Sequence, residues 1–361
     1  MDWTKSGRTD WFEFRRIDAG AGVDGTEQAL TGITGGSLTW NWFSDTEVSG
    51  SLTASNTPML QNAIVRVYLC SRLGDDTERI ELATCFAHTS RGHYEHGVYS
   101  GEIELVGTLT RYTEDKMWKD WSIPKGGSAL TYLGYLMRYL GGVYVVKGVK
   151  DKKFSTNKIV EFGKSPYTAI NVIASVCGAQ VNADSHGRLV FEPYVSAANK
   201  PVKGEIPSGV KSLTLDGIDI ESTQNGTPNR AAVMYKYKET YTSGGKQKTR
   251  ERVIYGLAAT AKSSVTSAQR AGRFITRTYT PKEMKPQTQA RANQLAATYL
   301  KRAGGFTTSY TFNMLYYPVH IGEVWGFKHG SIRCDGIITQ IDMQLVPGAP
   351  MTVTMRRVRS R

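Results

Sequence analysis

Alternation of apolar and polar residues dominates the first hundred positions of the chain. Short alternating runs are separated by clusters of Gly, Asn, Asp and Ser, which favour turns. In chain order the runs are WFEFRRI, SLTWNWF, SGSLTA, AIVRVYLC, RIELATCFA and GEIELVGTL. A two-residue period is that of a strand with one buried face, so this region is predicted to form an antiparallel β-barrel or β-sandwich.

A helical period replaces the alternation after Trp118. The residues that fall on one face of the segment 129–140 are Leu133, Leu136, Met137 and Leu140. The sequence Gly126-Gly127-Ser128 precedes this segment and Gly141-Gly142 follows it. Such a bounded apolar stripe predicts an amphipathic helix that packs against another element.

Residues 163–194 predict a second helix followed by a hairpin. Ser165 is placed to cap the helix, Pro166 occupies its first position and Gly178 ends it. The residues that recur at three and four residue steps are Ala169, Ile170, Ile173, Val176 and Cys177. Two short strands, 181–183 and 188–192, are expected around the turn 184–187.

Strand patterns return after a Pro and Gly bearing linker at 201–207. One helix is expected among them, at 286–303, and the residues on its apolar face are Ala292, Leu295, Ala296, Tyr299 and Leu300. The predicted fold class is mixed and β-rich, with two antiparallel β-barrel domains of similar strand count separated by an α/β insert. The expected bounds are 1–115, 116–205 and 206–361.

Composition is that of a soluble globular protein, with 40% hydrophobic and 21% charged residues. We find no secretory leader and no apolar stretch that approaches the ~20 residues needed to span a bilayer. The four cysteines, Cys70, Cys85, Cys177 and Cys334, include no CxxC pair. This spacing indicates a reduced compartment and argues against a disulfide framework.

The net charge of +13 is concentrated in two places. One is the tail at 355–361, which contains Arg356 and Arg357. The other is a predicted hairpin at 233–253, whose cations are Lys236, Lys238, Lys246, Lys248, Arg250 and Arg252. Tyr235, Tyr237 and Tyr241 interleave with them, a combination that suits phosphate contact and base stacking. A solvated arm, or an arm that contacts an acidic neighbour, fits the same residues.

A possible metal site consists of Cys85, His88, His93 and His96, which are ligand types that zinc prefers. Their spacing is not that of a known zinc motif, so a polar loop at a hairpin tip is the preferred interpretation. The motif Gly20-Ala21-Gly22-Val23-Asp24-Gly25 matches G-x-G-x-x-G, but no crossover helix can follow it. We find no paired carboxylates and no Ser, His and Asp set, so neither catalytic residues nor a cofactor are expected.

Three segments together resemble the hub proteins of bacteriophage tail tips and baseplates, the family that also supplies the amino-terminal part of tail-associated lysins. The first is VYSGEIELVGTLTRYTEDKM with the following WSIPKGGSALTYLGYLMRYL, and the second is the helix and hairpin of 163–194. The third is the run from Tyr317 to Val324 with GIITQIDMQLVPGAPMTVTMRR. The resemblance covers most of residues 10–358.

The resemblance implies two tail-tube-like barrels per chain, so that a homotrimer presents six barrels to a sixfold tail ring. The implied function is that of a structural hub at the virion tail tip, assembled in the bacterial host cytoplasm, with roles in host attachment and DNA ejection. The implied partners are the distal tail ring protein, the tape-measure protein, a central fibre or spike, and genomic DNA that passes through the lumen without specific binding. Because the chain stops at Arg361 without an appended lytic domain, cell-wall cleavage is not expected.

Two other classes of function compete with this one. The first is a nucleic-acid-binding protein that uses the hairpin 233–253. DNA binding with a steep salt dependence would support this function. The second, with weaker support, is a β-rich hydrolase of unknown type. A threefold particle or higher ring would favour the hub.

Overall fold

The structure is a computed structural model, and it describes residues 1–58, 60, 63–208, 212–223, 228–262, 267–280, 288–303 and 307–360. Contacts within the chain divide it into two compact units. The larger unit comprises Met1–Ile218 and Thr311–Arg361, and the smaller unit is Asp219–Tyr310. The third expected domain, 206–361, is thus shared between the two units.

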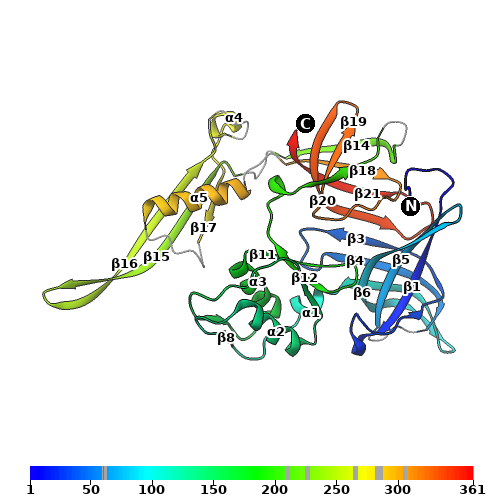
Figure 1. Ribbon diagram of the computed structural model, residues 1–361, viewed down its shortest axis with the longest axis horizontal. Coiled ribbons are helices and arrows are strands. Elements are labelled where there is room, and N and C mark those ends of the chain that lie inside the picture. Colours follow the sequence, from blue (N-terminus) through cyan, green and yellow to red (C-terminus); the bar gives the residue numbers. More distant parts are fainter. Residues whose placement is uncertain are drawn as a thin grey trace. The chain divides into compact units, whose positions relative to one another are not determined.

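The larger unit contains an extended β-sheet (Figure 1). Its strands from the first part of the chain are β1 (Thr9–Asp18), β2 (Gln28–Ala29), β3 (Ile33–Asn41), β4 (Val48–Thr57), β5 (Ala63–Leu73), β6 (Asp76–Glu95) and β7 (Val98–Gly107). Its later strands are β13 (Val202–Glu205), β14 (Thr214–Thr223), β18 (Thr307–Met314), β19 (Val324–His329), β20 (Ile332–Gln344) and β21 (Met351–Ser360). Strands β14 and β18 run across the boundaries of the two units, at Ile218 and Thr311. A short 3-10 helix, η1 (Ala19–Ala21), follows β1, where the Gly-rich motif had suggested a loop.

The strand order is β14-β18-β21-β20-β3-β4-β7-β6-β5-β1-β2, and β19 pairs with both β13 and β20. The pairings from β20 to β2 are all antiparallel. The β-rich, antiparallel prediction is therefore confirmed. Among the described strands the order ends at β14 and β2, and the branch through β19 ends at β13. The arrangement as two barrels stays a prediction.

Strand β5 forms the most deeply buried part of this sheet. Its first nine residues, 63–71, are all buried, including Ile64 and Val65, which have no exposed surface. A run without alternation is typical of a strand that is covered on both faces. Arg66 is the one charged residue in this run, so its guanidinium must find partners inside the protein.

The α/β insert is part of the larger unit and has its own hydrophobic core. Its elements are α1 (Thr110–Thr113), β8 (Trp121–Ile123), α2 (Ala129–Leu140), β9 (Tyr144–Val146), β10 (Lys158–Val160), α3 (Pro166–Cys177), β11 (Ala179–Ala183), β12 (Leu189–Pro193) and the 3-10 helix η2 (Ala197–Asn199). Strand β12 pairs antiparallel with β11 and parallel with β9. The core joins Leu133 and Met137 of α2 to Ile170 and Ile173 of α3 and to Phe191 of β12.

The two helices begin and end as the sequence predicts, with one difference. Gly141 and Gly178 both adopt left-handed φ angles, of 62° and 69°, directly after α2 and α3. The Ser128 side chain accepts a hydrogen bond from the Thr131 amide, as an N-cap should. Ser165 precedes α3, but its side chain caps no backbone amide and lies 3.3 Å from the Thr168 hydroxyl instead. Ser165 therefore occupies the N-cap position as predicted, with an extended backbone, but the expected side-chain hydrogen bond is absent, and Pro166 follows at the start of the helix.

The smaller unit is a three-stranded sheet with a helix packed on it. Its elements are β15 (Arg230–Ser243), β16 (Lys246–Ala259), α4 (Ala268–Ala271), β17 (Thr276–Tyr279) and α5 (Gln289–Ala303). Helix α5 packs through Leu295 and Ala296 onto Val233 of β15, and Tyr299 stacks on Tyr279 of β17 at 4.4 Å. The predicted helix at 286–303 is confirmed from Gln289 onward, and positions 286 and 287 lie outside the described residues.

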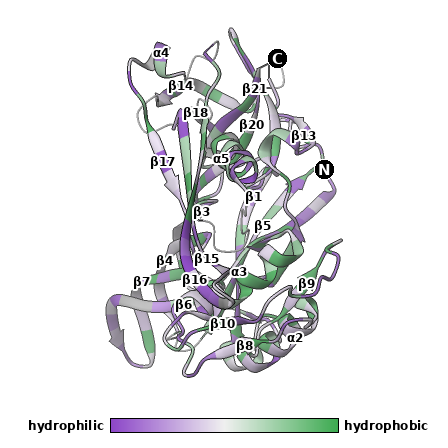
Figure 2. Ribbon diagram, turned by 90° about the vertical axis from the view of Figure 1, so that its left-hand side faces the viewer, coloured by the Kyte–Doolittle hydropathy of each residue, from purple (hydrophilic) through white to green (hydrophobic). Residues whose placement is uncertain are grey.

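Apolar colouring marks α2 and α3, whereas the hairpin of β15 and β16 is largely hydrophilic (Figure 2). None of the helices in the described part of the chain is long and apolar enough to cross a bilayer.

Candidate functional site

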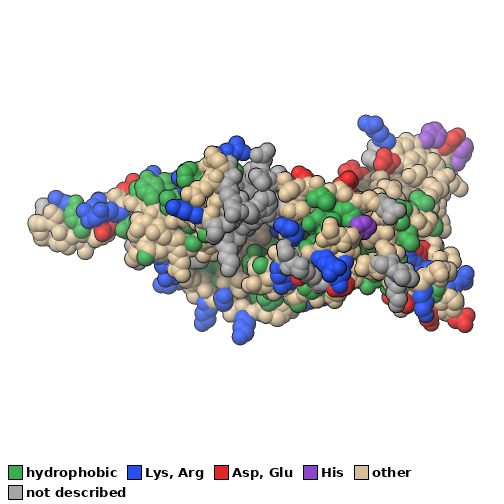
Figure 3. Space-filling view, turned by 90° about the horizontal axis from the view of Figure 1, so that it is seen from above, with side chains coloured by type: hydrophobic (Ala, Val, Ile, Leu, Met, Phe, Trp, Pro, Cys, Tyr) green, Lys and Arg blue, Asp and Glu red, His purple; other side chains and the backbone are tan. Residues whose placement is uncertain are grey.

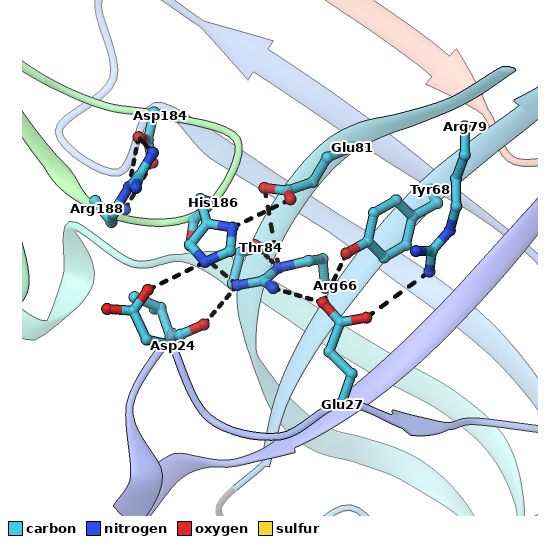
Figure 4. Close-up of polar contacts among 11 residues, drawn as sticks. Asp24, Glu27, Arg66, Tyr68, Arg79, Glu81, Thr84, Asp184, His186 and Arg188 are labelled. Carbon is cyan, nitrogen blue, oxygen red and sulfur yellow. Dashed lines mark hydrogen bonds and ion pairs between the residues drawn. The ribbon is translucent and has the colours of Figure 1, made fainter.

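The buried Arg66 organises a polar cluster on the sheet of the larger unit (Figure 4). Its side chain is only 3% exposed. Nη1 lies 2.6 Å from Glu27 Oε1, Nη2 donates to the Val23 carbonyl at 2.6 Å, and Nε donates to the Thr84 hydroxyl at 2.9 Å. Each nitrogen of the guanidinium therefore has a partner, which offsets its removal from water.

Glu27 is held from three sides. Besides Arg66, the Tyr68 hydroxyl donates to Oε1 at 2.6 Å, and Arg79 Nη2 lies 3.7 Å from Oε2. The Arg79 guanidinium also stacks on the Tyr68 ring, 3.5 Å from its centroid. Burial alone would raise the pKa of Glu27, but the hydrogen bonds from Tyr68 and Arg66 and the two arginine charges lower it overall. Glu27 is therefore ionised in this cluster at neutral pH.

The turn between β11 and β12 docks onto this cluster through His186. Its Nδ1 lies 3.1 Å from Glu81 Oε2 and its Nε2 lies 3.1 Å from Asp24 Oδ1. Both ring nitrogens of His186 therefore face carboxylate oxygens. The His186 carbonyl in turn accepts from Arg66 Nη2 at 3.4 Å. The hydrogen bonds and ion pairs of this cluster hold its side chains to one another, and they do not resemble the arrangement of a nucleophile with its base.

Gly187 shows how closely this turn approaches the sheet. Its φ of 80° is left-handed, and a Cβ atom placed there would lie 2.7 Å from Thr108 Cγ2. Only glycine fits both conditions without displacing its neighbours. The Asp184 side chain closes the turn by accepting from the Arg188 amide at 2.8 Å. The hairpin thus anchors the α/β insert to the sheet.

Glu47, between β3 and β4, makes a second contact with this hairpin. Its Oε2 accepts a hydrogen bond of 2.8 Å from the Ala183 amide, and its side chain is buried. Burial raises the pKa of Glu47 to about 7, and the charge of Glu192 acts in the same direction. The Ala183 hydrogen bond opposes this shift without cancelling it.

A cavity of about 300 Å³ lies beside Glu47. Its apolar walls include Trp40 and Trp42 from the segment that ends β3, Ile341 and Met343 from β20, and its polar lining includes Asn182 of the hairpin. The walls are mainly apolar, and their carboxylates are the buried Glu47 together with Glu81 and Asp184. Strand β6 and the segment 316–321 also border the cavity.

The candidate metal ligands are not brought together. Cys85 lies inside β6 and has no exposed surface, and burial raises the pKa of its thiol to about 12. His93 and His96 are exposed at the far end of the β6–β7 hairpin, beside Glu95 at 3.2 and 3.4 Å. At ~3.3 Å per residue, Cys85 and His93 are separated by roughly 26 Å of strand. His88 is also exposed. Within the described residues, no group of three or more potential ligands surrounds a common point.

The basic residues of 233–253 occupy a long hairpin of β15 and β16 in the smaller unit. Glu239 accepts hydrogen bonds from Arg250 Nε at 2.6 Å and from Arg252 Nε at 2.9 Å. Tyr235 and Tyr237 stack with their centroids 6.0 Å apart. Lys236 and Lys248 are exposed, whereas the side chains of Lys238 and Lys246 lie outside the part that the structure describes.

The second basic segment, with Arg356 and Arg357, is a strand of the sheet and not a free tail. Arg356 lies on β21 with its guanidinium 5.6 Å from the centroid of the Phe43 ring, and burial lowers its pKa. Arg357 pairs with Gly336 of β20. Arg359 of the same strand forms an ion pair with Asp335 at 3.2 Å. These two basic segments therefore belong to different compact units.

The sequence alone did not single out six polar residues of this region, namely Arg66, Glu27, Glu81, Asp24, His186 and Glu47. One signal was present, namely a single arginine within the apolar run AIVRVYLC. Charged residues are almost never fully buried unless they are paired, so this position indicates a buried ion pair. Its partners could not be identified, since Arg66 and His186 are 120 residues apart.

Neither a scan against protein-family models nor a search of curated protein sequences gave a match. Solved structures do match over nearly the whole chain. A tail protein from Neisseria meningitidis MC58 superimposes with a TM-score of 0.65 at 12% identity, covering 96% of this chain and 97% of that one. The 43 kDa tail protein of prophage MuSo2 from Shewanella oneidensis gives 0.61 at 12% identity, with 97% and 98% covered. Prophage tail protein gp18 from Listeria monocytogenes EGD-e gives 0.54 at 10% identity, with 95% and 94% covered.

Proposed function

We propose, on the premise that the chain has the fold of bacteriophage tail proteins, that it is a structural component of a phage tail tip or baseplate. The observation that carries this proposal is the length of the match. Two tail proteins from different bacteria align over at least 96% of this chain and of their own. A shared fold does not fix function by itself, but a match of whole chains to proteins of one kind of assembly favours a role in such an assembly.

The more specific proposal is a hub with two related β-barrel domains, bounded at 1–115 and 206–361 around the α/β domain 116–205. The sheet order supports it. The pairing between β20 and β3 divides the strand order into two groups. The strands of 206–361 that join the sheet are all on the β20 side, and the strands of 1–115 are all on the β3 side. The smaller unit, Asp219–Tyr310, is then an insertion in the second barrel domain.

As a homotrimer, such a hub presents six barrels and connects a sixfold tail ring to a threefold tip. Its proposed neighbours are the distal tail ring protein, the tape-measure protein and a central fibre or spike, around a lumen through which DNA is ejected. Assembly in the host cytoplasm and a place at the virion tail tip follow from this role, as does a part in host attachment. The proposal includes no catalytic step.

Negative-stain electron microscopy and mass photometry of the purified protein test the hub directly. We expect a threefold particle of about 120 kDa, three times the chain mass of 39.9 kDa. If the protein alone is monomeric, the same measurement is repeated after co-expression with the distal tail ring protein. A monomer under both conditions, or a ring without threefold or sixfold symmetry, would contradict the hub.

The competing function is a nucleic-acid-binding protein that acts outside the virion through the hairpin 233–253. The tyrosines and arginines on that hairpin favour it. The whole-chain likeness to tail proteins favours the hub. Tight DNA binding by a protein that never assembles would support the competing function.

A further inference from the structure

The positive charge of the chain resides almost entirely in the smaller unit. Residues 219–310 contain sixteen Lys and Arg against five Asp and Glu, a formal charge of +11 out of +13. The larger unit, about three times as long, has 29 basic and 27 acidic residues. Exposed Lys and Arg side chains are visible along the hairpin at the left of the molecule in Figure 3, with few acidic ones between them. A compact unit with this charge attracts polyanions.

The distal part of this hairpin forms an arm, which we define as residues 236–253 of β15 and β16. Strand β17 pairs with residues 230–233, and α5 contacts β16 at Tyr255, Gly256 and Leu257. Figure 1 shows the two strands continuing beyond both elements. The register between β15 and β16 contains no bulge, so side chains opposite one another share a face.

One face of the arm combines aromatic and cationic residues. Tyr237 lies opposite Arg252, Glu239 opposite Arg250, and Tyr241 opposite Lys248. Lys236 belongs to the other face, because successive side chains of a strand alternate. The Arg250 guanidinium lies 4.8 Å from the centroid of the Tyr241 ring. The tyrosines that interleave with lysines in the sequence therefore accompany arginines in space.

Glu239 orders the two arginines. It accepts from the Nε atoms of both Arg250 and Arg252, which leaves the Nη groups of each guanidinium unused by this bond. Both arginine side chains are about half exposed, at 46% and 48%, so these ion pairs add little to stability. Their effect is to hold two guanidinium groups side by side, which lowers the entropy lost when an anion binds.

We propose that this face of the arm binds the phosphodiester backbone of nucleic acid, with Arg250 and Arg252 contacting phosphate oxygens and Lys248 adding charge. Arg250 and Arg252 are two positions apart on β16, a separation of about 6.7 Å along the strand. This separation is comparable with the spacing of successive phosphates along a nucleic-acid strand. The exposed ring of Tyr241 offers a surface on which a base can stack. This inference does not rest on the proposed tail function.

An acidic protein surface is the other polyanion that could bind here, and the composition disfavours it. Cores of protein interfaces are depleted in Lys, whereas this face of the arm exposes Lys248 beside its arginines. Contacts with phosphates do not require the lysine to lose its water, because the free energy of such contacts comes largely from the release of counterions.

Fluorescence anisotropy with labelled DNA of about 30 nucleotides, single-stranded and duplex, tests the proposal on the full chain at about 50, 100 and 200 mM NaCl. The variant R250Q/R252Q removes the guanidinium pair. The variant R72Q/R91Q removes the same charge from exposed positions of the larger unit and serves as the matched control. Circular dichroism confirms that each variant is folded, and mass photometry of the same samples reports assembly independently.

We expect the R250Q/R252Q variant to bind roughly tenfold more weakly at about 100 mM salt, with the slope of log Kd against log salt reduced by about 2 for duplex DNA. The R72Q/R91Q control should retain the affinity and slope of the wild type. An equal loss of DNA affinity in the two variants, or no DNA binding by the wild type at about 50 mM salt, would overturn the proposal. Polyglutamate of matched length that binds as tightly as DNA would also overturn it, in favour of an acidic protein partner.

Discussion

Arg66 shows how one buried charge can determine the surroundings of many residues. The cluster around it joins the loop after β1, the strands β5 and β6, and the turn between β11 and β12. A buried ion pair contributes little compared with a well-packed apolar residue, but removal of one partner leaves an uncompensated charge. The cluster therefore specifies how these segments fit together more than it adds to stability.

Replacement of Arg66 by Met should destabilise the larger unit by about 3 to 5 kcal/mol, because Glu27 and Glu81 then lose their buried counter-charge. Urea denaturation followed by fluorescence measures the free energy of unfolding. The control is R72M on the same strand, where the side chain is exposed and the expected change is within about 0.5 kcal/mol. A loss in R66M no larger than that in R72M would show that the cluster is not essential.

Glu47 gives the larger unit a specific dependence on pH. Its folded pKa of about 7 lies above the ordinary value of 4.5, so the folded state holds a proton that the unfolded state releases. The free energy of unfolding should therefore be unaffected by this group below pH 4.5, fall as the pH rises toward 7, and level off above it. The total fall is about 3 kcal/mol, from about 1.4 kcal/mol per pKa unit.

The variant E47Q removes this titration and retains an oxygen that can accept from the Ala183 amide. We expect the wild type to lose stability relative to E47Q between pH 4.5 and 7, with a constant difference at higher pH. Urea denaturation at a series of pH values measures the difference. A difference that is the same at every pH would contradict the assigned titration.

At the scale of elements, local signals were enough to locate the helices. Helix α2 occupies Ala129–Leu140 as predicted, because an apolar stripe, a serine cap and a terminal glycine all lie within a few residues of it. The buried side of α3 was also predictable, except that Ala174 is buried and Val176 only partly so. The docking of the β11–β12 turn could not be predicted, because it depends on residues more than 100 positions away.

Ile173 tests the role of α3 in assembly. Its side chain is fully buried in the core of the insert, so I173D places a charge where no partner exists and should abolish soluble assembly. The control N171D adds the same charge at an exposed position of the same helix and should assemble normally. Size-exclusion chromatography and mass photometry report the outcome. An intact trimer of I173D would count strongly against the proposed packing and the hub.

At the scale of the whole molecule, the sequence predicted the β-rich class and the resemblance predicted the fold of the solved tail proteins. Neither the sequence nor the resemblance showed that the strands from the two ends of the chain share one sheet. Strand β20 makes this connection, since its residues 332–337 pair with β19 and its residues 340–344 pair with β3. No local pattern marks such a pairing, because alternation fixes which face of a strand is buried but not its neighbour.

The pairing of β3 with β20 has a consequence for how the protein is made. Residues 37–41 meet residues 340–344, and the Thr39 hydroxyl donates to Asp342 at 2.7 Å, so the contact joins positions about 300 residues apart. During synthesis at ~5 to 20 residues per second, β3 keeps one edge unpaired for at least 15 seconds while the rest of the chain emerges. An open strand edge is a site for pairing with other chains, so chaperone protection in this interval should decide the yield of folded protein.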